Sequence, residues 1–204
     1  MGKISDDKYK IIKEMYYVKK MSMNAIALHL DVGIDAVTYF MRKYDMKRRT
    51  VALSNNFVFQ NKALSFKEKI KLSKKQENLK LVGLMLYWAE GYKTIKSKGI
   101  DFANSDKDMI LIFVKFLREI YQIDEKRLRV LLYCYSDQKI SECLDFWSKL
   151  TGIPKSQFSK PYIRKDFKTT GRKMKYGMIH VRYSDKKLFL AIIESINKLK
   201  YGIC

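Results

Sequence analysis

The residues with the clearest chemical potential stand at the end of an apolar run near the middle of the chain. Residues 81–90 carry no charged side chain until the last of them, Glu90, and Gly91 and Lys93 follow directly. A carboxylate at the C-terminus of a helix lies at the negative end of the helix dipole, so a compensating cation is expected beside it. Glu90 is therefore a candidate metal ligand. The alternative is that Glu90 pairs with Lys93 or caps a turn.

Magnesium suits a site of this kind. It takes few protein ligands, mostly carboxylate oxygens, and completes its shell with water and phosphate. Divalent ions held in this way can activate water and stabilise the leaving oxygen in phosphodiester hydrolysis. We expect Glu90 to be the catalytic carboxylate that binds the metal, with Mg²⁺ or another divalent cation as cofactor. Lys93 and Lys98 are candidates to stabilise charge on the phosphate, although their spacing does not distinguish between them.

The overall charge indicates a polyanionic partner. The 204 residues include 42 Lys and Arg against 21 Asp and Glu, a formal net charge of +21, and apolar residues make up 47% of the chain. Such an imbalance opposes folding by self-repulsion, and nucleic acid is the usual reason to retain it, ahead of an anionic membrane surface. No apolar run approaches the roughly 18 residues of a membrane span. We expect a cytoplasmic protein that is nucleoid-associated when bound to DNA.

The chain reads as three regions within an α+β fold. Residues 1–50 have the pattern of a compact helical module, and residues 78–204 mix helices with strands. Residues 51–77 form a basic connector, of which the second half, SFKEKIKLSKKQE, is expected to be helical. Both the module and the larger region are therefore expected to fold around apolar faces of their own.

Two short helices are predicted within residues 21–49. Ser22 is a suitable N-cap for the first, and the second is expected over 33–43. Asp31 and Gly33 separate them, because both residue types tolerate the left-handed backbone of a tight turn. The predicted inward-facing residues are Ile26, Ala27, Leu30, Val37, Phe40 and Met41.

The spacing of Ala27, Val32 and Val37 resembles the helix-turn-helix of the resolvase and transposase families. The resemblance implies that 33–43 is a recognition helix for a DNA major groove. Its outward side chains would be Ile34, Asp35, Thr38, Tyr39 and Arg42, followed by Lys47, Arg48 and Arg49 on phosphates. The alternative is a three-helix bundle that makes no contact with a groove.

Period-two alternation predicts strands within 99–105, 127–136 and 175–184. One face would be apolar and packed on helices in an antiparallel sheet. The other face would offer Arg127, Arg129, Tyr133, Tyr135, His180 and Arg182 to DNA. Arginine can reach guanine edges and phosphates, whereas the alternative is an ordinary solvated face. The basic segment 160–175 contains Lys168, Arg172 and Lys173, which we expect on phosphates.

The stretch GLMLYWAEG at 83–91 resembles the motif of LAGLIDADG homing endonucleases, with Leu86, Ala89, Glu90 and Gly91 at matching positions. The resemblance covers about residues 78–204 and places Glu90 on a metal-binding acid. It implies an αββαβαβα domain with an antiparallel sheet. Trp88 stands where the motif has its first acid, and Met85 where it has a small residue.

In that family two motif helices pack side by side, and each delivers one acid to the scissile phosphates. A chain with one motif is then expected to form a homodimer through helix 79–90, with Gly83 and Ala89 at a shifted close contact. The sequence therefore predicts a metal-dependent, sequence-specific endonuclease of double-stranded DNA. The alternatives are a non-catalytic DNA-binding regulator on the same fold and an RNA-binding maturase-like protein.

Overall fold

The chain forms two compact units in a computed structural model, Met1–Ala63 and Leu64–Cys204. The structure describes residues 4–94, 96–164 and 174–203. The division falls inside the connector at 51–77, so residues 51–63 belong to the first unit and 64–77 to the second. The first unit contains η1 (Asp6–Lys8), α1 (Tyr9–Lys13), the π-helical turn η2 (Glu14–Val18), α2 (Met23–His29), α3 (Ile34–Lys43) and α4 (Val51–Asn61).

Helices α2 and α3 form where the sequence predicts two short helices. The Ser22 side chain caps α2 by accepting the Ala25 N–H at 3.0 Å. Asp31 takes the left-handed backbone conformation of the turn, with φ 51°. Gly33 instead is extended, with φ −72°, and is the N-cap of α3. The predicted inward residues Ile26, Ala27, Val37, Phe40 and Met41 are buried, and Leu30 packs against them half-buried.

The connector differs from its prediction. Its first half forms helix α4, capped by Thr50, and the expected helix in its second half is absent from residues 62–73. Lys67 and Lys69 there donate their backbone N–H groups to the carbonyls of Tyr121 and Ile120, at 2.9 and 2.8 Å. Because Phe66 and Leu72 also pack on the core of the second unit, tertiary contacts replace the hydrogen bonds that a helix would supply.

The second unit is an α+β domain around a mixed sheet. Its elements are α5 (Lys74–Glu90), β1 (Ile100–Asn104), α6 (Lys107–Glu119), η3 (Glu125–Arg127), β2 (Leu128–Tyr135), α7 (Ile140–Thr151), η4 (Lys155–Gln157), β3 (Tyr162–Arg164), β4 (Met178–Tyr183) and α8 (Lys186–Ile203). The four described strands lie in the order β1-β4-β2-β3. None of the helices within the described ranges is long and apolar enough to cross a bilayer.

The sheet departs from the predicted antiparallel arrangement at one edge. Strand β4 runs antiparallel to both β1 and β2, but β3 runs parallel to β2. The connection through α7 and η4 returns the chain to the end of the sheet where β2 began, which is what a parallel neighbour requires. The strand pair expected after the motif is also reduced. Among the described residues only β1 forms there, and it is paired along its whole length with β4. The segment before it contributes a single bridge, between Gly91 and Phe102.

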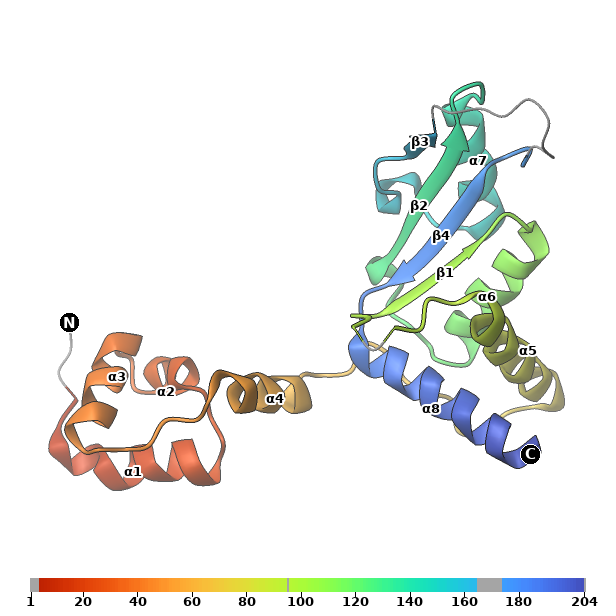
Figure 1. Cartoon of the computed structure of the whole chain (residues 1–204). Coiled ribbons are helices and arrows are strands. Elements are labelled where there is room, and N and C mark those ends of the chain that lie inside the picture. The colour runs from red at the N-terminus through yellow and green to blue at the C-terminus, as the bar shows by residue number, and fades with distance from the viewer. Residues whose placement is uncertain (1–3, 95, 165–173, 204) are drawn as a thin grey trace. The chain divides into compact units, whose positions relative to one another are not determined.

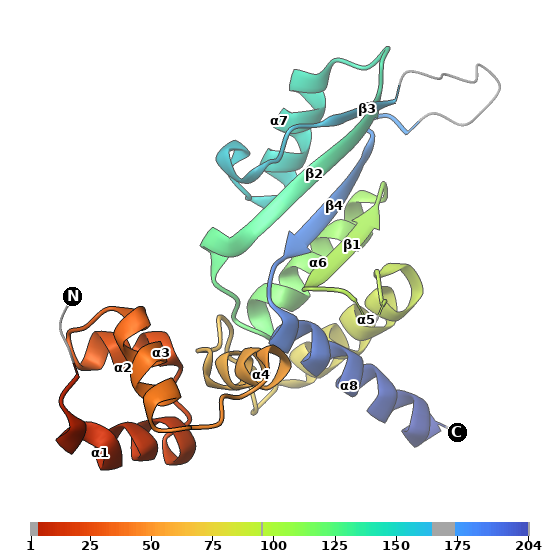
Figure 2. The same ribbon diagram turned by 60° about the vertical axis from the view of Figure 1, so that its left-hand side comes forward.

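One face of the sheet is covered by the helices of its own unit, and the other is bare of them among the described residues (Figures 1 and 2). Residues alternate along the strands between buried and partly exposed, as a half-covered sheet requires. The largest buried side chains of the core include Tyr87, Phe102, Phe113, Phe116, Tyr121, Trp147 and Tyr183. We call the uncovered side, which carries Asp101, Arg129, Tyr133, His180 and Arg182, the open face.

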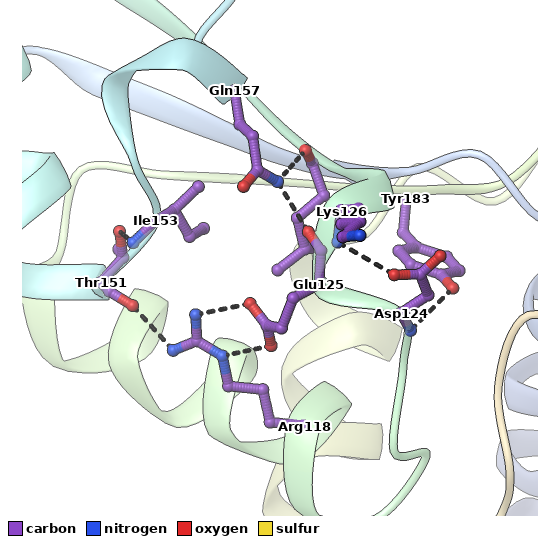
Figure 3. Close-up of polar contacts among 9 residues, drawn as sticks. Arg118, Asp124, Glu125, Lys126, Thr151, Ile153, Gln157 and Tyr183 are labelled. Carbon is purple, nitrogen blue, oxygen red and sulfur yellow. Dashed lines mark hydrogen bonds and ion pairs between the residues drawn. The ribbon is translucent and has the colours of Figure 1, made fainter.

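A polar cluster fixes the start of β2 against the helices (Figure 3). Arg118, near the end of α6, forms a bidentate ion pair with Glu125 at 2.7 and 2.9 Å, and it donates to the carbonyl of Thr151 at 2.7 Å. Gln157 donates to the carbonyls of Glu125 and Leu128 at 2.6 and 2.7 Å. The cluster therefore joins α6, α7 and η4 to the strand that carries much of the open face.

Candidate nucleic-acid interface

Charged side chains lie in register across three strands of the open face. Asp101 of β1 is opposite Arg182 of β4, which is in turn opposite Arg129 of β2. Like charges placed directly opposite each other on a sheet are destabilising. The neighbouring arginines therefore favour an anion at this place, and Asp101 neutralises only part of their charge.

Asp101 holds two of its neighbours in place. Arg182 donates its Nε–H to Asp101 Oδ2 at 2.9 Å, and His180 Nδ1 lies 2.7 Å from Asp101 Oδ1. Since a carboxylate accepts hydrogen bonds, the proton of this contact is on Nδ1 of the imidazole. Burial alone would raise the pKa of Asp101, but the hydrogen bond from His180 and the charges of His180 and Arg182 outweigh it and lower that pKa. Asp101 is absent from the residues that the sequence predicts for DNA contact on this face.

Arg129 and Arg127, which the sequence placed together, occupy different environments. Arg129 is exposed on the open face, and its guanidinium donates to the carbonyls of Lys126 and Leu128, each at 2.7 Å. Arg127 precedes β2 in the turn η3 instead of standing on the strand. Its guanidinium lies 5.5 Å from the ring centre of Tyr183, which is a core residue, and it donates to the Ser184 carbonyl. Arg127 therefore tethers the end of β4 to the start of β2.

The next part of the open face is aromatic. The ring centres of His180 and Tyr133 are 4.8 Å apart, and those of Tyr133 and Tyr162 are 4.9 Å apart. Tyr133 is paired in register with Tyr162, and Tyr135 with Arg164. Tyr133 and Tyr135 are half-buried, whereas Tyr162 is 56% exposed. Tyr162 and Arg164 were missed from the sequence because three residues are too few for alternation to identify a strand.

Glu90 lies at the C-terminus of α5 with its side chain exposed. No group among the described residues forms a hydrogen bond or ion pair with it. Lys93, the alternative partner, instead donates to the carbonyls of Trp88 and Gly91 at 2.7 and 2.8 Å. A cation there complements the helix dipole. Lys93 is thus engaged as a cap of α5, which leaves the Glu90 carboxylate available.

The described residues offer one carboxylate for a metal at this position, that of Glu90. Within the described ranges, no three His, Cys, Asp or Glu side chains come together in a way that could hold a metal ion. One exposed carboxylate matches the small number of protein ligands that Mg²⁺ takes, provided that phosphate and water complete its shell. Lys98 lies apart from Lys93, in a hollow of about 350 Å³ that is also lined by Lys96, Asp101 and Arg182.

Helix α5 has one face in the core and one in solvent. Gly83 is buried against Phe116 of α6, where an added Cβ would lie 2.2 Å from Phe116 Cγ. The expectation that Gly83 serves a contact with a second chain is therefore wrong, because its open side is already filled by its own α6. Ala89 is exposed. The exposed apolar stripe of α5 consists of Leu81, Val82, Met85 and Trp88.

The first unit presents part of the predicted recognition surface. On α3, Tyr39 is 65% exposed, Arg42 is exposed, and half-buried Thr38 donates its hydroxyl to the Ile34 carbonyl at 3.0 Å. Arg48 is exposed as well. The remaining outward residues of the prediction, Ile34, Asp35 and Lys47, are exposed too.

Arg49 has structural contacts that the sequence did not indicate. Its guanidinium carbon lies 4.1 Å from the ring centre of Tyr16 and 5.0 Å from that of Phe57. The guanidinium also donates to the carbonyls of Lys20 and Met21. Arg49 thereby joins α4 to the turn before α2. The predicted phosphate contacts Lys168, Arg172 and Lys173 lie outside the described residues.

No protein-family model, curated protein or solved structure matches this chain. The features that bear on function are therefore the charge, the open face and the end of α5.

Proposed function

We propose that the protein binds DNA sequence-specifically through the open face of its sheet. The observation that carries the proposal is the register of Arg182 and Arg129 in a chain of net charge +21. Across the four described strands, Asp101 is the single acidic side chain on this face. Arginine is suited to guanine edges and phosphates, and a sheet whose other face is packed on helices holds these side chains on a rigid base.

The N-terminal unit adds a second DNA contact in this proposal. Helix α3 would enter a major groove with Tyr39 and Arg42, and Arg48 would bind a phosphate. The support is the turn at Asp31 and the exposed outer side of α3. Two separate units that each read part of a site would explain a basic charge distributed over the whole chain.

The activity we propose is metal-dependent cleavage of DNA, in line with the resemblance to LAGLIDADG endonucleases. Glu90 would hold Mg²⁺, which when bound supplies an activated water and charge stabilisation at the phosphate. Lys98 would contribute positive charge from the hollow beside Arg182. Glu90 is exposed and has no hydrogen-bond or ion-pair partner among the described residues, which supports this role because its carboxylate is free to bind a cation.

A homodimer through α5 belongs to the same proposal. The stripe Leu81, Val82, Met85 and Trp88 is exposed at 46, 42, 43 and 36%. Four large apolar side chains on one helical face are expected to be covered by a partner. A twin α5 would bring a second Glu90 to the site, and such an isologous contact predicts a roughly palindromic target.

A non-catalytic DNA-binding regulator is the second candidate. The observation in its favour is that each chain offers a single acid at this position, with Trp88 in place of the other acid of the motif. Binding would then persist without cleavage, and Glu90 would have no catalytic consequence.

The two candidates are separated by one set of measurements on the full chain. A target is first selected from a random duplex library, and affinity is then measured by fluorescence anisotropy over a salt series. We expect a steep loss of affinity with salt, because each phosphate contact releases counterions. Arg182→Gln should weaken binding, whereas Glu142→Gln on α7, away from the open face, should not.

Cleavage is then followed on a plasmid that carries the selected site, with Mg²⁺ and with EDTA. A nuclease cuts only with Mg²⁺, and Glu90→Gln abolishes cutting while leaving affinity equal or slightly higher. Specific binding without cutting favours the regulator. A salt-independent, weak interaction with all duplexes would refute both.

A further inference from the structure

The aromatic residues of the open face form a continuous row across three strands. His180 stands on β4, Tyr133 on β2 and Tyr162 on β3. Neighbouring ring planes are inclined by only 32° and 38°, with centres 4.8 and 4.9 Å apart. The rings of each pair are therefore in tilted contact, at the spacing that adjacent strands impose.

The row ends at an edge of the sheet. Strand β3 is the outermost of the described strands on this side, so Tyr162 has a ring neighbour on one side, Tyr133, and the end of the sheet on the other. Its 56% exposure is large for a tyrosine that belongs to an aromatic cluster. One further flat ring could extend the row by contact with the exposed ring of Tyr162.

The charge around the row favours a particular kind of ring. Arg129 and Arg182 lie on the same face, and the acid of the described strands on that face, Asp101, is already paired with Arg182 and His180. An aromatic ring attached to an anion fits these surroundings, and a nucleotide is such a group. A base that stacks on tyrosine gains contact without requiring a particular hydrogen-bond pattern.

Base pairing decides which nucleotides can use the row. In an intact duplex both faces of a base are covered by its neighbours, and a protein reaches only the base edges in the grooves. A ring stacks most readily on an unpaired base, as in a bulge, a loop or a single-stranded end, because insertion between paired bases must first unstack them. The tyrosines thus suit an unpaired base, whereas the arginines beside them suit the phosphates and base edges of a duplex.

We propose that the row His180, Tyr133 and Tyr162 is a stacking site for an unpaired base, located next to the duplex-binding part of the open face. This rests on the proposed function, because it assumes that the open face binds nucleic acid. It adds the preferred substrate, which is a duplex interrupted by at least one unpaired nucleotide. The stacking chemistry is shared by DNA and RNA.

The test compares three labelled probes with the full chain by fluorescence anisotropy. They are a perfect DNA duplex, the same duplex with one bulged 2-aminopurine, and an RNA duplex with the same bulge. We expect the bulged DNA to bind about tenfold more tightly than the perfect duplex, which corresponds to about 1.4 kcal/mol. Stacking on tyrosine should also quench the 2-aminopurine fluorescence.

Two substitutions at one position isolate the ring. Tyr162→Phe keeps the aromatic face and should keep both the preference and the quenching. Tyr162→Leu removes the ring, and the bulged and perfect duplexes should then bind equally. The matched control is Tyr201→Leu, which removes an exposed tyrosine from α8, outside the open face. It should leave the preference unchanged.

The outcomes distinguish this inference from the proposed function. If no probe binds, the proposed function fails. If the perfect duplex binds as tightly as the bulged probes, or if Tyr162→Leu retains the preference, the stacking site is refuted while duplex binding stands. If the preference appears only with the RNA bulge, the row is a stacking site for RNA, and the DNA arm of the inference is overturned.

Discussion

The substitution Gly83→Ala should destabilise the second unit strongly, although it replaces the helix-breaking residue of α5 with the best helix former. At an open position in a helix, the same change stabilises by about 1 kcal/mol. Here the new Cβ would lie 2.2 Å from Cγ and 2.7 Å from Cβ of Phe116, both near the backbone of α6. The predicted sign is thus opposite to that of helix propensity.

The size of the destabilisation by Gly83→Ala follows from how far α5 and α6 must move apart. Non-bonded carbon atoms settle at about 3.5–4.0 Å, so α5 and α6 must separate by roughly 1 Å or more. Phe116 is fully buried and cannot turn into solvent. Overpacking a core of this kind costs about 1–3 kcal/mol, and we expect the upper end, about 3 kcal/mol. At roughly 3 °C per kcal/mol for a domain near this size, Tm should fall by about 9 °C.

Tryptophan fluorescence is the appropriate assay, because both tryptophans, Trp88 and Trp147, belong to the second unit. The matched control is Gly202→Ala in α8, where an added Cβ meets no atom within 4 Å. The Tm of this variant should stay the same or rise slightly. A rise in the midpoint for Gly83→Ala would refute the close packing of α5 on α6. If the fall in Tm caused by Gly83→Ala becomes larger as the protein is diluted, Gly83 lies at a contact between chains instead.

Three further predictions concern the polar contacts. The pKa of Asp101 is lowered in the folded state, so the stability that Asp101 contributes is present above its unfolded pKa of about 3.9 and is lost as pH falls below that value toward the folded pKa. Asp101→Asn should therefore reduce the fall in the urea midpoint of the second unit at acid pH. An unchanged dependence of that midpoint on pH would contradict the pairing. Arg118→Met removes the pair with Glu125 and the hydrogen bond to the Thr151 carbonyl. Because Glu125 is 50% exposed, the change should cost only about 1 kcal/mol by urea denaturation, and a loss of about 3 kcal/mol would contradict a solvated pair. Lys93→Met removes the cap of α5 and should cost about 0.3–1 kcal/mol by the same assay, and a variant that loses cleavage with no change in stability would show that Lys93 acts on the phosphate instead.

The elements with strong periodicity could be predicted from the sequence. Helices α2 and α3, the Ser22 cap and the alternation along β2 and β4 depend on neighbours in the chain, and all appear where the pattern indicates them. The α+β class followed from the same patterns. Local signals suffice there because capping and burial of one face act over a few residues.

The misjudged segments are those in which distant contacts override local preference. Residues 65–73 have a helix-compatible composition, yet their amides bond to residues 120 and 121, which no local pattern reveals. Gly83 could face either a second chain or its own α6, and only the packing of Phe116 decides between them. The parallel direction of β3 similarly depends on the path of the chain through α7 and η4.

Some features of the candidate site could be predicted from the sequence, and others depend on the tertiary structure. Composition and alternation determined that the chain is strongly basic and that Arg129, Tyr133, His180 and Arg182 share a face, because period-two geometry is a property of a strand by itself. Strand order and register decided which of them meet. They brought Asp101 between His180 and Arg182 from 79 and 81 residues away, and they ended the aromatic row at Tyr162. A sequence specifies which side of a strand each residue occupies, but pairing between strands far apart in the chain is set by the packing of the whole domain.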